Sequence, residues 1–343
     1  MSFLPLLFRL LVRSAYLFPA VLLAADVPLE LTWPTSGTAW MRGKSFEAFA
    51  QHAGSGDPES GTFGGVRSAG QQFHEGLDIR SEARDRRGQP LDEIRAALDG
   101  VVRHVARNPG ESSYGRYLVL EHPDHSPAVY TLYAHLARVA PDVRPGSTVR
   151  RGHVLGVMGN SADKPFPRER AHLHFELGLM VTQNFQRWYD RRKFGSRNEQ
   201  GVWNGMNLMG VDPLWVFDGW RQGRVRTMAD VFRNVPPAVR LRIATHQSPD
   251  FIRRYPSLLT RPLPMGPVAG WEITFGWTGL PFAWTPLTAM EVAGLAREKP
   301  IVTWVDAALE RRERSKTLVV SRRGQWHTAK DLDTVLQQLF GLK

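Results

Sequence analysis

The chain has 343 residues, enough for two domains, and its 42% hydrophobic and 22% charged residues are typical of a folded globular protein. It contains no cysteine, which excludes disulfides, iron–sulfur clusters, cysteine-based zinc sites, a cysteine nucleophile and a lipoprotein anchor. The formal net charge of +11 favours polyanionic surroundings, such as nucleic acid, anionic lipid or an acidic cell-wall polymer.

The amino terminus is a predicted signal peptide over residues 1–25. Its only charges are Arg9 and Arg13, and the apolar run that follows, about a dozen residues, is too short to span a bilayer. Small residues at 24 and 25 predict cleavage just before Asp26. An uncleaved membrane anchor over residues 3–25 is the alternative. In both cases we expect the rest of the chain to be exported, periplasmic or secreted, and after cleavage to have no stable membrane insertion.

Residues 26–60 are rich in Gly, Ser and Pro and are expected to be a lead-in of loop and edge strand. From residue 61 to 218 short β-rich segments follow one another, bounded by Gly, Pro, Asn or Asp. They cover 100–106, 117–121, 128–134, 153–157 and 172–177. This spacing predicts a mainly β domain with an antiparallel sheet. The polar, aromatic stretch 182–210 is predicted to be a surface insertion in that domain.

Residues 219–343 differ in composition and are predicted to form a basic α+β domain of unknown role. Residues 211–343 contain 19 Lys and Arg against 12 Asp and Glu. Apolar residues at i, i+3, i+4, i+7 and i+8 predict a last helix over 328–342, with Thr328 as N-cap and Gly341 as its end. Four tryptophans of this part could stack on glycans, but core positions are the preferred interpretation. They are Trp271, Trp277, Trp284 and Trp304.

Two short motifs suggest a metal site. In FHEGLDI, residues 73–79, His74 and Asp78 would lie roughly 13 Å apart on an extended strand, too far to share an ion. Gly76 between them permits the bend that would bring both onto one metal. In AHLHFEL, residues 171–177, His172 and His174 fall on one face of a predicted half-buried strand. One ring could bind a metal while the other reaches its water.

A third motif, YTLYAHL at residues 130–136, places His135 at a strand end. Together the three motifs supply two histidines and one aspartate for a single tetrahedral zinc ion per chain, with the fourth position open to water. Two further histidines remain for proton transfer. There is no HExxH helix, so a histidine has to act as the base, and the sequence does not decide which one.

The chain resembles the lysostaphin-like (LytM-domain) zinc metallopeptidases, which cut peptidoglycan peptides. The resemblance covers residues 61–215 and includes GTFGGVR at 61–67, the FHEGLDI box, GSTVRRGHVLGVMG at 146–159, the following Asn-Ser, and HLHFEL. It implies a duplicated hybrid motif fold with the site in a groove, and a zinc endopeptidase acting on peptidoglycan stem peptides. The residues it implies are the zinc ligands His74, Asp78 and His174 and the catalytic His135 and His172.

Two segments depart from the family pattern, the basic loop 162–170 and the insertion 182–210. Both are expected to flank the groove, and Arg168 and Arg170 could engage substrate carboxylates. A non-catalytic scaffold or amidase regulator that binds the cell wall is the main alternative, since some relatives have lost their zinc ligands. A phosphocarrier and a nucleic-acid-binding protein fit less well, because the HxGxD pair does not suit the former and no known nucleic-acid module is present. No nucleic-acid partner is expected.

Overall fold

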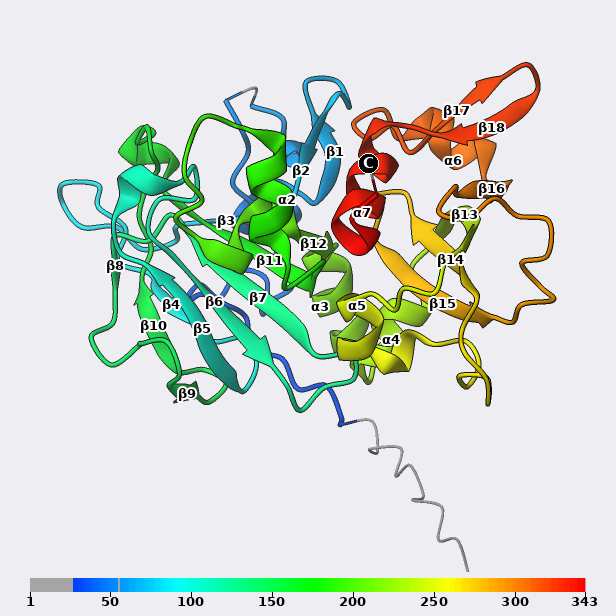
Figure 1. The fold of residues 1–343 in the computed structure, drawn as a ribbon. Coiled ribbons are helices and arrows are strands. Elements are labelled where there is room, and N and C mark those ends of the chain that lie inside the picture. Colours follow the sequence, from blue (N-terminus) through cyan, green and yellow to red (C-terminus); the bar gives the residue numbers. More distant parts are fainter. Residues whose placement is uncertain (1–26, 55, 343) are drawn as a thin grey trace, which may run out of the picture.

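The computed structural model describes residues 27–54 and 56–342 (Figure 1). The predicted signal peptide over residues 1–25 lies outside the described residues. None of the helices in the described ranges has the length and hydrophobicity needed to pass through a bilayer.

A seven-stranded antiparallel sheet carries the site. Its strands are hydrogen-bonded in the order β12-β11-β7-β6-β5-β9. Strand β3 pairs with the first half of β11, and β12 pairs with its second half along the same edge. These strands are β3 (Leu77–Arg80), β5 (Gly100–Ala106), β6 (Tyr117–His122), β7 (Val129–Ala134), β9 (Thr148–Val149), β11 (His172–Met180) and β12 (Leu208–Val211). The predicted mainly β, antiparallel core is confirmed, and the strands expected at 100–106, 117–121, 128–134 and 172–177 are β5, β6, β7 and β11.

Smaller sheets complete the amino-terminal part. One has the order β4-β10-β8, and β1 pairs with β2 as a hairpin beside the site. Their bounds are β1 (Gly64–Arg67), β2 (Gln72–His74), β4 (Glu93–Arg95), β8 (Arg138–Val139) and β10 (Val154–Val157). The lead-in 26–60, expected to be loop and edge strand, also contains helix α1 (Phe46–Phe49). Trp33 stacks on Trp40 at 4.6 Å, and both rings pack against Phe217, so this segment contributes to the core.

Strand β11 is buried along its whole length, although a half-buried strand was predicted. Its odd-numbered residues, such as Leu173 and Phe175, belong to the main hydrophobic cluster. Its even-numbered polar residues, His172, His174 and Glu176, are also buried and belong to the candidate site described below. The insertion 182–210 also differs from a simple surface loop, because it contains helix α2 (Phe185–Arg192), whose aromatic side chains are buried, and ends in β12.

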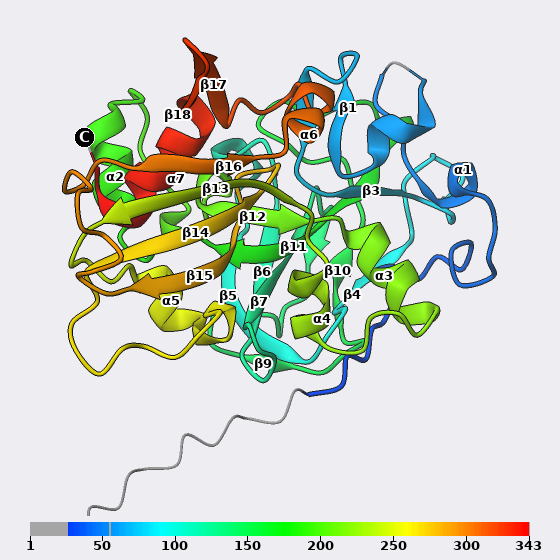
Figure 2. The same ribbon diagram turned by 90° about the vertical axis from the view of Figure 1, so that its right-hand side faces the viewer.

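The carboxyl-terminal part contains a four-stranded antiparallel sheet of order β15-β14-β13-β16, which Figure 2 shows beside the central sheet. The strands here are β13 (Pro237–Ala244), β14 (Gly270–Gly276), β15 (Pro281–Leu287), β16 (Ile301–Val305), β17 (Val319–Arg322) and β18 (Gln325–Thr328). The helices are α3 (Pro213–Arg221), α4 (Met228–Arg233), α5 (Asp250–Arg254), α6 (Ala307–Arg312) and α7 (Lys330–Phe340). One hydrophobic cluster joins the two parts, since Phe175 and Trp271 both belong to it.

The predicted last helix is α7, which ends at Gly341 in a left-handed conformation as expected. The N-cap prediction is wrong: Thr328 ends strand β18, and Ala329 precedes the helix without a side-chain cap. The helix is therefore held by packing of its apolar face more than by capping. Of the four tryptophans, Trp271 and Trp284 are fully buried core residues, whereas Trp304 is 41% exposed.

Candidate active site

The three predicted metal ligands lie where strands β2, β3 and β11 meet. His74 ends β2, and Asp78 of β3 is the direct cross-strand partner of His174 in β11. His74 Nε2 lies 3.1 Å from Asp78 Oδ1 and 3.1 Å from His174 Nδ1. The third distance, from His174 Nδ1 to Asp78 Oδ1, is 3.0 Å. Pairing of β3 with β11 thus brings together residues that are far apart in the chain.

Gly76 allows this convergence. It lies in a bend between His74 and Asp78, as the sequence predicted. The structure adds a second reason for glycine: a Cβ at this position would lie 2.4 Å from the carbonyl oxygen of Phe175 in β11. Any side chain at residue 76 would therefore push the bend away from the strand that carries His174.

Each imidazole in this cluster is oriented by its other ring nitrogen. His74 donates its Nδ1–H to the carbonyl oxygen of Thr62 at 2.7 Å, which leaves Nε2 facing the cluster. His174 uses Nε2 to donate to the Glu176 carboxylate at 3.0 Å, which leaves Nδ1 facing the cluster. Such outer partners fix ring orientation and are typical of metal-bound histidines.

Glu176 is a buried carboxylate with three hydrogen-bond partners, and the sequence did not lead us to predict a role for it. Besides His174, its carboxylate accepts hydrogen bonds from the Tyr114 hydroxyl at 2.5 Å and the Tyr130 hydroxyl at 2.9 Å. Burial and the nearby Glu176 charge raise the pKa of both tyrosines well above the usual value, so both remain protonated donors. The sequence contained a signal for this role, because residues 172, 174 and 176 alternate along the strand and therefore share one face.

Arg67 is a second residue without a predicted role. From β1 it donates to Asp78 Oδ2 at 2.6 Å, and its Nε donates to the carbonyl oxygen of Ser60 at 2.9 Å. One carboxylate oxygen of Asp78 is thereby engaged by arginine, and the other, Oδ1, faces the histidines. Nothing local in the GGVR sequence indicates this contact.

The two predicted catalytic histidines adjoin the ligand cluster. The rings of His135 and His172 lie 4.9 Å apart between centroids. His135 donates Nδ1–H to the carbonyl oxygen of Ser161 at 2.8 Å, and His172 donates to that of Arg170 at 2.7 Å. In the neutral rings Nε2 is therefore the unprotonated nitrogen. His135 also has a φ of +64°, a left-handed backbone conformation that is uncommon for non-glycine residues.

Burial and mutual contacts set the charges of this cluster. Burial lowers the pKa of His172, and burial together with the facing His172 and His174 rings lowers that of His135 well below its usual value. For Asp78, burial opposes ionisation, but the neighbouring His74 and His172 and the hydrogen bonds it accepts hold its pKa well below the usual range. Near neutral pH the site thus combines an ionised carboxylate with neutral imidazoles at 135 and 172.

The donor set fits a divalent zinc ion. The ligand atoms of His74, Asp78 and His174 lie within 4.8 Å of one another, and all three residues are buried. In a tetrahedral zinc site with bonds of roughly 2.0–2.1 Å, ligand atoms are about 3.3 Å apart. The distances of 3.0–3.1 Å found here differ by only a few tenths of an ångström.

The other histidines lie outside this cluster. His122 is buried and bonds to the carbonyl oxygen of Asp99 and to Thr131, and His153 pairs with Asp142 on the surface. His125 is also buried, and the remaining ones are partly buried or exposed: His52, His104, His246 and His327. Of the two arginines that could engage substrate carboxylates, Arg168 donates a hydrogen bond to the carbonyl oxygen of Arg87.

Residues 72–185 match Peptidase family M23, whose members are metallopeptidases. No curated protein matches the chain. The catalytic domain of the antimicrobial peptidase lysostaphin from Staphylococcus simulans is similar at 20% identity, with 31% of this chain and 67% of that chain covered and a TM-score of 0.24. A zinc containing peptidase from Vibrio cholerae is similar at 28% identity over 31% of this chain and 26% of that chain, with a TM-score of 0.23. A catalytic-domain mutant of the prophage-encoded M23 protein EnpA from Enterococcus faecalis is similar at 22% identity over 38% of this chain and 87% of that chain, with a TM-score of 0.26.

The chain therefore spans 26% of the length of the Vibrio peptidase and 67% of the lysostaphin catalytic domain. The assignment to the family rests on the match over residues 72–185. That range includes His74 of β2, Asp78 of β3 and His174 of β11. The outer parts of the site, such as Arg67, lie outside the matched range. Residues 72–185 are an M23 peptidase domain.

Proposed function

We propose that the protein is a zinc-dependent endopeptidase that hydrolyses the peptide cross-links of peptidoglycan. The observation that supports this most is the convergence of His74, Asp78 and His174, with His135 and His172 beside them, inside an M23 domain. An inactive scaffold would have no need of a complete ligand set with an oriented outer shell.

In this proposal His74, Asp78 and His174 hold one zinc ion per chain. When bound, zinc supplies Lewis acidity, which acidifies water and polarises the scissile carbonyl. Arg67 and Glu176 keep the carboxylate and the His174 ring in place. The buried surroundings strengthen every charge–charge contact in the site.

His135 and His172 act on protons. Each presents an unprotonated Nε2 because its Nδ1–H is bound to a backbone carbonyl. One ring accepts a proton as the oxygen of water bonds to the carbonyl carbon. The carbon–nitrogen bond then breaks, and a protonated ring gives its proton to the leaving amine. Either histidine can serve as the base in this geometry.

The substrate and the compartment belong to the same proposal. A basic, exported hydrolase meets the anionic stem peptides of the cell wall, whose carboxylates complement the positive net charge that the chain keeps after loss of Arg9 and Arg13 with the signal peptide. We take the amide between two stem peptides as the scissile bond, with the D-alanine–diaminopimelate bond as first choice over a glycine bridge. The predicted signal peptide over residues 1–25 would deliver the enzyme there.

Purified sacculi treated with the zinc-loaded protein test this proposal. Chromatography of the released muropeptides should show loss of cross-linked dimers and a matching gain of monomers. His174→Ala, matched to the wild type in concentration, is the control that lacks a ligand. Shortened glycan chains with intact cross-links would refute the endopeptidase, and no change with fully zinc-loaded protein would favour the scaffold alternative.

A further inference from the structure

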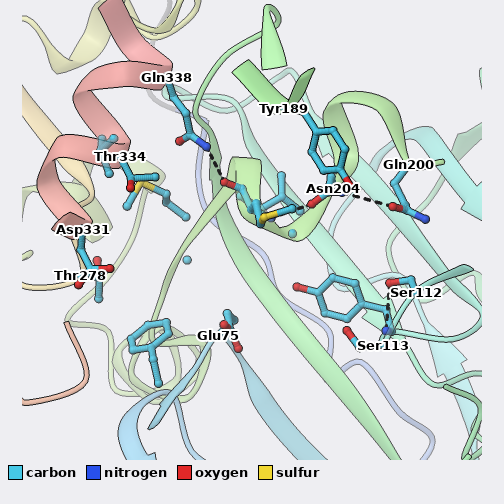
Figure 3. A pocket seen from close by; sticks show the side chains of 18 of the residues that line it. Glu75, Ser112, Ser113, Tyr189, Gln200, Asn204, Thr278, Asp331, Thr334 and Gln338 are labelled. Carbon is cyan, nitrogen blue, oxygen red and sulfur yellow. Dashed lines mark hydrogen bonds between the residues drawn. The ribbon is translucent and has the colours of Figure 1, made fainter. Parts of the chain in front are cut away.

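A large cavity of about 570 Å³ adjoins Glu75, the residue next to the candidate ligand His74 (Figure 3). Glu75, the residue after His74, lines it, and so does Tyr114, whose hydroxyl is bonded to Glu176. Since Glu176 also binds His174, two hydrogen bonds link the cavity wall at Tyr114 to His174, and Glu75 is the chain neighbour of His74. A peptide lying across the histidines could therefore extend into it.

Two of its walls come from outside the matched M23 residues. Figure 3 shows Asp331, Thr334 and Gln338 of α7 on one side and Tyr189, Gln200 and Asn204 of the 182–210 insertion on the other. The Gln338 side chain donates to the carbonyl oxygen of Met206 at 2.8 Å and so ties α7 to the insertion. This gives residues 219–343 a place at the site that their sequence did not indicate.

The carboxyl-terminal part also reaches the β1–β2 hairpin, whose last residue is the ligand candidate His74. The Lys316 ammonium lies 4.6 Å from the centre of the Phe73 ring, and both residues line the cavity. Phe73 immediately precedes His74. The charge of Lys316 is thereby placed at the cavity wall, over the ring of the residue that precedes His74.

The charges that line the cavity have both signs. Glu75 is exposed to it and has no hydrogen bond or ion pair with another described residue, and Asp331 stands on α7. Lys316 and Arg197 are the basic members, and the Arg197 side chain is 92% exposed with only a distant contact to Glu199 at 3.9 Å. Hydroxyl and amide side chains also line the cavity. This mixture suits a ligand that carries an ammonium and a carboxylate together.

We propose that this cavity is a substrate subsite that binds the zwitterionic end of a diamino acid in a peptidoglycan stem peptide. Glu75 binds the ammonium, Lys316 binds the carboxylate, and α7 forms the wall that encloses them. The free end of a diamino acid carries both groups on one carbon, which matches the opposite charges that line the cavity. This inference rests on the proposed function, because it names part of the substrate of the same site.

Binding of synthetic stem tetrapeptides to the zinc-loaded His172→Ala protein, measured by calorimetry, tests the subsite without hydrolysis. The three probes have a free diaminopimelate end, an acetylated amine or an amidated carboxylate. Each is titrated into proteins that also carry Glu75→Gln or Lys316→Met. Glu59→Gln and Lys299→Met are matched controls, since both residues are exposed and lie outside the cavity lining. Zinc content is measured for every protein.

We expect the free peptide to bind about 10-fold more tightly than either blocked peptide, as loss of a charge-assisted hydrogen bond predicts. Glu75→Gln should remove the preference for the free amine only, and Lys316→Met the preference for the free carboxylate only. Thr334→Trp, which fills the cavity from α7, should weaken binding of all three. The two control substitutions should change none of these affinities.

The results separate the subsite from the catalytic proposal. If the wild type cleaves sacculi but the cavity variants bind all peptides as their controls do, the subsite is refuted and the function stands. If sacculi are not cleaved but binding depends on the cavity, the catalytic proposal fails and the subsite stands. Equal binding of free and blocked peptides by all proteins would overturn the assignment of a zwitterionic ligand.

Discussion

Replacing Gly76 with alanine should separate the metal ligands without removing any of them. A Cβ at residue 76 would lie 2.4 Å from the Phe175 carbonyl oxygen, whereas ordinary contacts begin near 3.4 Å. Relief of this overlap requires a shift of about 1 Å, several times the ±0.2 Å tolerance of metal–ligand distances. Because Asp78 pairs with His174 next to Phe175, the shift would pull Asp78 away from His174.

We expect Gly76→Ala to weaken zinc binding about 100-fold, at the upper end of effects from residues that orient ligands. Overpacking should lower the free energy of unfolding of the metal-free protein by about 1–3 kcal/mol. Competition with a chromogenic chelator measures the affinity, and urea denaturation measures the stability. Gly266→Ala is the control, since nothing lies within 4 Å of its Cβ position. Wild-type zinc affinity in Gly76→Ala would refute the close approach as the constraint on ligand geometry.

Three further outcomes are expected. His174→Ala should lose most of its zinc by elemental analysis, whereas His135→Ala should keep zinc and lose about 10²–10⁴-fold in turnover; the reverse pattern would contradict the assigned roles. Glu176→Gln should weaken zinc binding by about 10–100-fold, because the His174 ring loses its anionic partner, and unchanged affinity in the chelator assay would show that the ring is held by packing alone. His122 concerns stability: burial lowers its pKa to about 4 from 6.5, so the unfolded state binds the proton first, and stability is lost as the pH falls below 6.5. That loss amounts to about 3 kcal/mol by pH 4. His122→Asn should be less stable at pH 7.5 but flatter between pH 6.5 and 4 in urea denaturation, and an unchanged slope would argue against a buried neutral histidine.

Several features of this protein could be predicted from the sequence because they depend on local periodicity. Alternation placed His172 and His174 on one face of a strand, and the same alternation, carried two residues further, would have included Glu176. The bend at Gly76 followed from the spacing of His74 and Asp78. The last helix and its glycine end were equally local, whereas the cap at Thr328 failed because β18 continues through that residue.

Contacts between distant segments decided the rest. No pattern in the sequence indicates that Arg67 binds Asp78, or that Glu176 receives hydrogen bonds from Tyr114 in a turn and Tyr130 in β7. Likewise, the cavity exists only because α7 packs against the insertion, where Gln338 meets the backbone of Met206 across 132 positions of the chain. Local sequence fixes which groups can share a face, since that depends on backbone period alone. Which faces meet depends on how hydrophobic surfaces from the whole chain are buried together, and only the tertiary structure contains that information.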